Sequence, residues 1–136
     1  MKRIIFGLLL CACCLDGYPT SAQASYFDGM EAYRKSDYQT ALREFKNVDD
    51  DTKALYMIGV IYEKGQGVAI DHAEAAQWYR KAADKGYSAA QYRLGRYYER
   101  GLGVEQNSEE AVKWYKKSAK QGYVDARQAL KRIETK

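Results

Sequence analysis

Residues 54–87 read ALYMIGVIYEKGQGVAIDHAEAAQWYRKAADKGY, and residues 90–123 read AQYRLGRYYERGLGVEQNSEEAVKWYKKSAKQGY. The two stretches follow one pattern 36 residues apart, so that Gly59 recurs as Gly95 and Trp78 as Trp114. No insertion breaks the register between them. A fixed period of this size marks an array of stacked units, in which each unit covers the apolar face of its neighbour. The duplication therefore predicts the architecture of the chain before any single residue is interpreted.

Residues 52–64 are predicted to form the first helix of a unit, here called helix A. The apolar residues at helical spacing on its buried side are Ala54, Ile58, Ile61 and Tyr62. Gly59 lies inside this helix, where glycine costs about 1 kcal/mol relative to alanine. Because Gly95 repeats it, we expect both glycines to lie where two helices approach closely.

A glycine-rich connection, Gly65 to Val68, follows helix A and leads to a second helix, helix B. The glycines are expected to end helix A through a left-handed residue. They follow a helix and not a strand, which argues against a phosphate-binding loop. Asp71 with Glu74, and Asn107 with Glu110, have the spacing of a capping box at the start of helix B. Helix B is expected to run to about Lys85, and its inner residues would be Ala75, Tyr79, Ala82 and Ala83.

The flanking segments resemble incomplete units. Residues 25–51 are predicted to form a degenerate unit like a tetratricopeptide repeat, with Gly29, Ala41, Phe45 and Val48 at its small and aromatic positions. Residues 52–87 and 88–123 are the two full repeats. Residues 124–136 are predicted to form a third helix A that caps the stack, because its later half is polar.

The first 24 residues have the parts of a signal peptide in order: Lys2 and Arg3, an apolar run, and the Ala22-Gln23-Ala24 cleavage signal. We expect cleavage after Ala24, and a periplasmic or secreted protein. An alternative is lipoprotein processing, in which Leu10 to Cys13 acts as a lipobox and a lipidated Cys13 anchors the chain. All three cysteines lie in this segment, so the mature chain would form no disulfide and hold no thiolate metal site.

Charge and hydropathy argue against some classes of partner. Loss of Lys2, Arg3 and Asp16 changes the net charge from +4 to +3, which is too small to indicate nucleic acid. After residue 15 no run approaches the roughly 20 apolar residues of a transmembrane helix, so the mature chain is expected to have no transmembrane segment. His72 is the only histidine and lacks cysteine neighbours, so neither a metal nor a cofactor is predicted.

Both full repeats follow the pattern AxxxLGxxYxxGxGVxxDxxxAxxWYxxAAxxGxxxA, which resembles the Sel1-like repeat. The departures are Ile58 for leucine, Asn107 for the loop aspartate and Ser118 for the first alanine. The resemblance implies an all-α, right-handed superhelical solenoid of antiparallel helix pairs, with a concave face lined by helices A. It also implies an adaptor that binds other proteins.

Residues of helix A that are directed away from helix B would line this groove. We expect the protein-binding residues to be Tyr56, Val60, Lys64, Tyr92, Arg93, Arg96, Tyr97 and Arg100, with Glu63 and Glu99 beside them. Tyrosine and arginine together favour recognition of peptide carboxylates and extended chains. The alternative for this surface is an ordinary solvated helix face.

Two other functions remain open. Cysteine-rich relatives of the Sel1-like type have been credited with β-lactam hydrolysis, but this chain lacks their cysteines after residue 14. No serine has an evident histidine partner, so we expect a non-enzymatic adaptor of the cell envelope. The chain would otherwise be a structural subunit of a larger assembly.

A lysine stripe on the second helix B, namely Lys113, Lys116, Lys117 and Lys120, could meet an acidic partner or anionic lipid, or could be a solvated outer face.

Overall fold

A computed structural model describes residues 21–135, with side chains from residue 25 onward, and within this range it contains seven α-helices and no strand. Residues 1–20, which include Cys13 and most of the predicted signal peptide, lie outside the described residues. The prediction of an all-α fold is confirmed for the residues that are described.

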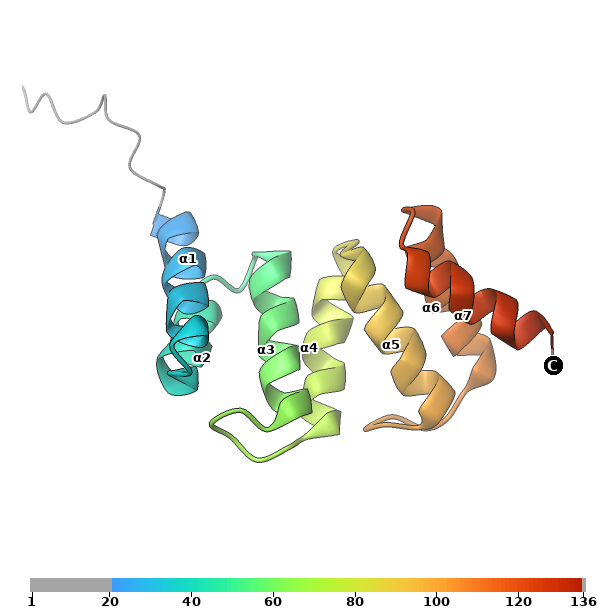
Figure 1. Ribbon diagram of the computed structural model, residues 1–136, viewed down its shortest axis with the longest axis horizontal. Helices are drawn as coiled ribbons and strands as arrows, with labels where there is room; N and C mark the ends of the chain where they lie inside the picture. The colour runs from blue at the N-terminus through green and yellow to red at the C-terminus, as the bar shows by residue number, and fades with distance from the viewer. Residues whose placement is uncertain (1–20, 136) are drawn as a thin grey trace, which may run out of the picture.

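The helices follow one another along the long axis of the molecule (Figure 1). In chain order they are α1 (Ser21–Arg34), α2 (Tyr38–Lys46), α3 (Thr52–Lys64), α4 (His72–Asp84), α5 (Ser88–Arg100), α6 (Ser108–Lys120) and α7 (Val124–Glu134). Helices α1, α3, α5 and α7 correspond to helix A, whereas α2, α4 and α6 correspond to helix B. Each helix packs mainly against the next one in sequence. The buried residues form several local clusters, as expected for a stack in which units contact only their neighbours.

Each helix pair is closed by an aromatic ring that lies on a glycine. A Cβ atom built on Gly59 would lie 2.6 Å from the Tyr79 ring, and one on Gly95 would lie 2.7 Å from the Tyr115 ring. The first helix pair has the same kind of contact, in which a Cβ atom built on Gly29 would lie 2.7 Å from the Phe45 ring. The close approach predicted for the mid-helix glycines is therefore confirmed, and their helix-propensity cost is offset by this packing.

The glycine-rich connections dock each pair on the preceding one. Gly65 ends α3 in the left-handed conformation, with φ of 66°, as predicted. Gly67 then lies against α2, where its carbonyl accepts a 2.5 Å hydrogen bond from Gln39 Nε2. In the next unit Gly103 lies on the first residues of α4, and a Cβ there would overlap the backbone of His72. The second glycine of each loop thus serves contact between repeats.

Short polar side chains begin the helices. Asp71 Oδ1 accepts a 2.9 Å hydrogen bond from the Glu74 amide, which confirms the predicted cap of α4. In a complete capping box the Glu74 side chain would also accept a hydrogen bond from the Asp71 amide. This part of the prediction is wrong, because the Asp71 amide donates to the Tyr62 carbonyl instead. Glu74 accepts a hydrogen bond from the Trp78 indole at 2.8 Å instead. The Tyr62 carbonyl therefore takes the place that the Glu74 side chain has in a complete capping box.

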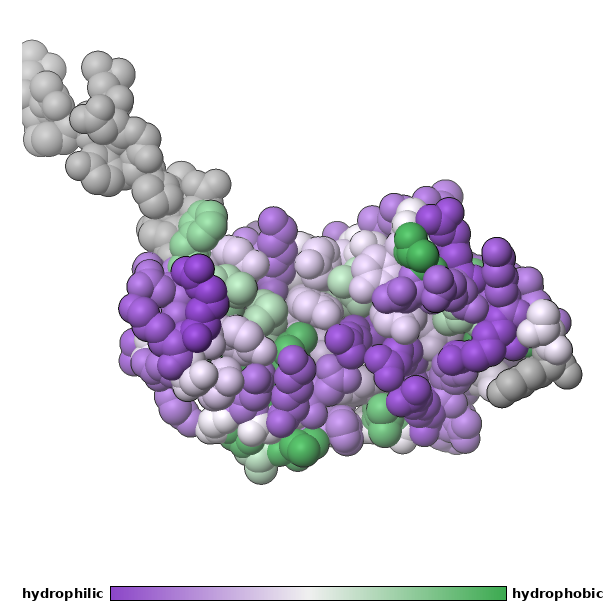
Figure 2. Space-filling model, in the orientation of Figure 1, coloured by the Kyte–Doolittle hydropathy of each residue, from purple (hydrophilic) through white to green (hydrophobic). Residues whose placement is uncertain are grey.

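The surface is mostly hydrophilic on the face shown in Figure 2, with small separate hydrophobic areas, one of them over the α3–α4 connection. Among the residues whose side chains are described, the exposed large apolar ones are Phe27, Ile70 and Val124. None of the described helices is both long enough and apolar enough to cross a lipid bilayer.

The docking of the second loop can be tested with two glycines that share a left-handed backbone. Gly103 (φ +63°) is blocked by the backbone of His72, whereas Gly122 (φ +89°) has open space where a Cβ would stand, with nothing within 4 Å. Gly122→Ala should cost about 1 kcal/mol, the strain of a left-handed alanine. Gly103→Ala should cost about 3 kcal/mol or more, because the backbone must also move. Urea unfolding of both variants measures the difference, and equal losses would contradict the docking role.

Candidate binding face

A buried tyrosine places one carboxylate in each full repeat. The Tyr79 hydroxyl donates a 2.7 Å hydrogen bond to Glu63 Oε2, and the Tyr115 hydroxyl donates one of 2.6 Å to Glu99 Oε2. Both tyrosines are fully buried. Burial, followed by the nearby glutamate, raises the pKa of each phenol well above its usual value. The two glutamates are therefore held by neutral donors at the ends of rigid rings.

Each of these glutamates is neutralised by an arginine from the next helix A, but from different positions. Arg93 Nη1 lies 3.4 Å from Glu63 Oε2, while Arg132 Nη2 lies 2.7 Å from Glu99 Oε1. Arg96 is the residue equivalent to Arg132, and its guanidinium lies 5.9 Å from the centre of the Tyr92 ring. The glutamate therefore has the same position in both repeats, whereas its arginine partner comes from a different position of the next helix A.

A row of half-buried tyrosines runs beside these ion pairs. Tyr56 lies 5.4 Å from Tyr87 and Tyr92 lies 5.3 Å from Tyr123, measured between ring centres. Tyr26 is the corresponding residue of α1, 5.9 Å from Phe45. We call the surface that carries Tyr26, Tyr56, Tyr87, Tyr92 and Tyr123 the tyrosine face. Burial is the main cause that raises the pKa of its members Tyr26, Tyr87 and Tyr123.

Four of the predicted groove residues meet on this face: Tyr56, Tyr92, Arg93 and Arg96, all partly exposed. The Arg96 guanidinium lies over the Tyr92 ring, which joins two of them directly. Lys64 and Arg100 are exposed in the last turns of α3 and α5, and no described contact joins them to the tyrosines or ion pairs.

The prediction that Val60 and Tyr97 line the groove is wrong. Val60 is 6% exposed and Tyr97 is 1% exposed, and both belong to the cluster around Tyr79. The ring of Tyr97 packs edge-on against Tyr79 at 5.5 Å between centres, because α5 covers this side of the preceding pair. A surface position in an isolated helix becomes core once the next repeat is added.

Three members of the face, Tyr26, Tyr87 and Tyr123, are absent from the predicted groove residues. Tyr87 and Tyr123 end the repeated Gly-Tyr pair before each helix A, a place that indicates packing. Their position in the sequence could have identified them. The residue just before each helix A lies beside the tyrosine on the helix A of the preceding helix pair, as Tyr87 lies beside Tyr56 and Tyr123 beside Tyr92.

A hollow of about 230 Å³ lies beside Tyr92 on this face. Its walls come from α5 and α7 and consist of Tyr92, Asp125, Gln128, Ala129 and Arg132. Asp125 and Gln128 were not among the predicted site residues. Their side chains lie on the helix that the sequence marks only as a cap.

The helices B carry a different pattern. Trp78 lies between Lys46 and Lys81, at 6.0 and 4.0 Å from the ring centre. Trp114 in the same way lies between Arg80 and Lys117, at 5.4 and 4.3 Å. These cations cover the indole rings, so part of the predicted lysine stripe is engaged in packing the repeat.

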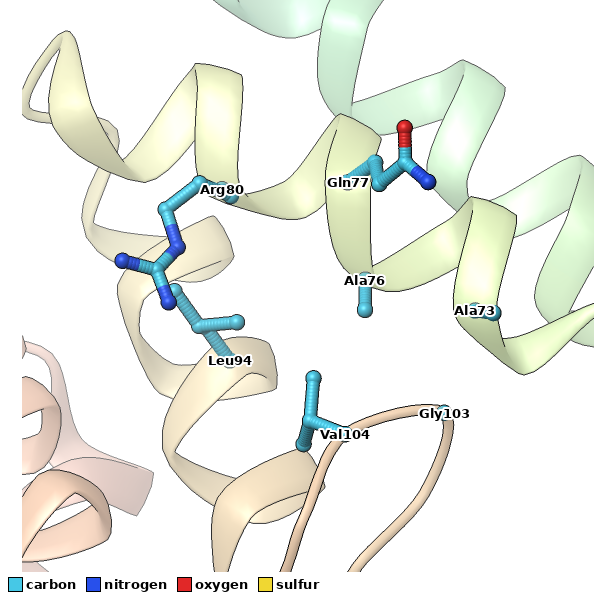
Figure 3. A pocket seen from close by; sticks show the side chains of 7 residues that line it. All are labelled: Ala73, Ala76, Gln77, Arg80, Leu94, Gly103 and Val104. Carbon is cyan, nitrogen blue, oxygen red and sulfur yellow. The ribbon is translucent and has the colours of Figure 1, made fainter.

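A second hollow lies on this side of the molecule, between α4, α5 and the loop after α5 (Figure 3). It measures about 210 Å³, and Ala76, Leu94 and Val104 form its apolar walls. The Arg80 side chain borders it and is directed toward Leu94 (Figure 3). Arg80 also donates to the Tyr98 hydroxyl, which holds the guanidinium in place.

Two polar side chains, those of Ser118 and His72, have local partners. Ser118 is buried and its hydroxyl donates a 2.8 Å hydrogen bond to the Ser88 carbonyl. His72 is partly buried, with Nδ1 3.4 Å from the Tyr97 hydroxyl. Within the part of the chain that the structure describes, no three metal-ligating side chains gather.

Comparison with known proteins matches a family model described as Sel1 repeat at residues 52–87 and 88–123. No curated protein matches the chain. Among solved structures, a Sel1 repeat protein from Oxalobacter formigenes is 37% identical, with a TM-score of 0.75 over 77% of this chain and 44% of that one. A protective antigen of uropathogenic Escherichia coli with an SLR fold is 32% identical, with a TM-score of 0.72 over 77% of this chain and 24% of that one.

A third structure, cysteine-rich protein B of Helicobacter pylori, is 24% identical, with a TM-score of 0.69 over 81% of this chain and 89% of that one. At this identity the likeness concerns the fold. The chain spans less than half the length of the first two structures. Together these matches confirm the predicted solenoid of helix pairs.

The buried phenols predict how stability depends on pH. The pKa values of Tyr79, Tyr97 and Tyr115 are raised above the ordinary value of 10.0. Above about pH 10 the unfolded chain loses protons that the folded chain keeps, so stability present below that pH is lost as pH rises. Each phenol adds a slope of up to about 1.4 kcal/mol per pH unit. Urea unfolding between about pH 9 and 11 measures the slope, which Tyr115→Phe should reduce by one phenol's share. An unchanged slope would contradict this assignment.

Proposed function

The chain belongs to the Sel1 repeat family, and we propose that it binds a protein or peptide segment on the tyrosine face. Membership in this family is consistent with a protein-interaction module. The finer proposal is that helices A present a concave, non-enzymatic binding surface of a cell-envelope adaptor.

One observation carries this proposal: each full repeat places a partly buried tyrosine, Tyr56 or Tyr92, at the same position of this face, and Arg93 and Arg96 of the second repeat lie beside them. Tyr56 and Tyr92 are held by neighbouring rings, and Arg93 by Glu63. Rings and guanidinium groups that are already ordered lose little conformational entropy on binding. Tyrosine and arginine are also the residue types that most often dominate binding energy at protein interfaces.

The contacts of the face favour an extended partner. The hydroxyls of Tyr56 and Tyr92 recur once in each full repeat, and Arg93 and Arg96 add N–H groups beside them. An extended peptide offers carbonyls and side chains at regular intervals along its length, so it can use several repeats at once. The outer side, in contrast, uses its cations to cover Trp78 and Trp114.

A binding experiment separates the two sides of the molecule. Linear peptides selected from a random displayed library on the wild-type protein should bind at least about tenfold more weakly, about 1.4 kcal/mol, to the Tyr92→Ala/Arg96→Ala variant. The matched control is Lys116→Ala/Lys120→Ala, two exposed residues of α6. Fluorescence anisotropy measures the affinities, and circular dichroism checks the fold. If only the α6 variant loses affinity, or if no peptide is selected, the proposed face is wrong.

The proposed location in the envelope rests on residues 1–24, and it has its own test. Mass spectrometry of the protein recovered from the native host should find a mature chain that begins at Ser25. A chain that begins at a lipid-modified Cys13 would show the alternative processing, and an unprocessed N-terminus would contradict both.

A further inference from the structure

One residue on the wall of the hollow beside Tyr92, Ala129 of α7, is small. Residues 125, 128, 129 and 132 of α7 stand 36 positions after residues 89, 92, 93 and 96 of α5. Arg93 lies against Glu63 of α3, whereas Ala129 stands at the equivalent place beside α5. Ala129 lines the space of about 230 Å³ and fills less of it than an arginine would. The preceding repeat therefore shows what this position holds when it is filled.

In that repeat the occupant is the chain's own arginine. Arg93 Nη1 lies 3.4 Å from Glu63 Oε2. Burial acts to lower the pKa of Arg93, but Tyr56 and Glu63 outweigh it and raise the pKa. A guanidinium is thus well accommodated between a tyrosine of one helix A and the next helix A.

The charges around the hollow fit the same group. Asp125 stands where the preceding repeat has Ala89, and it places a carboxylate on the wall of the hollow. This carboxylate takes part in none of the ion pairs among the described residues. The wall of the hollow therefore carries a negative charge that no cation of the described chain neutralises by direct contact.

The two arginines nearest the hollow are engaged elsewhere. Arg132 lines it, but the Nη2 atom of this residue donates to both oxygens of Glu99 at 2.7 Å. The Arg96 guanidinium lies by the Tyr92 ring and is not part of the wall. The hollow thus combines an aromatic ring, an uncommitted carboxylate and the Gln128 amide.

We propose that this hollow binds an arginine side chain of the partner peptide, at the place that Arg93 fills one repeat earlier. This inference rests on the proposed function, since it names the residue type that the tyrosine face selects. The planar guanidinium can pack on the Tyr92 ring while it donates two hydrogen bonds to Asp125. Lysine fits less well, because its point charge lacks the planar fork that matches a carboxylate.

The test uses small probes, so that it does not depend on a known partner. N-acetyl-arginine amide is titrated into the wild-type protein, with N-acetyl-citrulline amide as the neutral probe of the same shape. Backbone amide shifts of Gln128 and Ala129 should report arginine binding with a Kd on the order of 1–10 mM. Citrulline should bind at least about fivefold more weakly, because it lacks the charge that faces Asp125.

Two variants complete the test. Ala129→Arg places the chain's own guanidinium in the hollow, as at position 93, and should abolish the shifts. Asp125→Asn should reduce arginine binding to the level of citrulline, and it decides the outcome if Ala129→Arg does not fold. Equal binding of both probes, stronger binding of N-acetyl-glutamate amide, or an unchanged Kd in Asp125→Asn would overturn the proposal. Peptide binding that depends on Tyr92 but not on arginine would overturn it too, and would leave the proposed function standing.

Discussion

The contact between a glycine of helix A and an aromatic ring of helix B is the constraint on which the rest of the structure depends. It occurs in all three described helix pairs, and in each the ring occupies the space that a side chain on the glycine would need. The helices can approach closely only because that side chain is missing. The same contact fixes where the far end of the ring lies, and so it links the packing of a pair to the chemistry at its surface.

The residue four positions after each glycine shows this link. Where the ring is tyrosine, that residue is a glutamate, and the phenol donates to it: Tyr79 to Glu63 and Tyr115 to Glu99. In the first pair the ring is that of Phe45, which has no hydroxyl, and the residue four positions after Gly29 is Tyr33. The carboxylate is thus present only where a buried donor can hold it. What varies from repeat to repeat is the cation, and this variation gives the binding face its individual features.

The repeat period predicted the helices, the glycine contacts and the helix caps, because these depend on residues within one unit. It could not predict the burial of Val60 and Tyr97, which comes from the next unit in the stack. It also did not indicate that α7 lines a hollow, since the polar residues of that helix suggested only a cap. The face is assembled from side chains of successive units, and the pattern within a single helix does not bring them together.

The most direct test of the binding face is residue-resolved NMR mapping of a bound peptide onto the folded chain. We predict that chemical shifts change along the tyrosine face, at Tyr56, Tyr92 and Tyr123, in both full repeats. Changes confined to the outer surfaces of α2, α4 and α6, with the tyrosine face unaffected, would contradict this prediction.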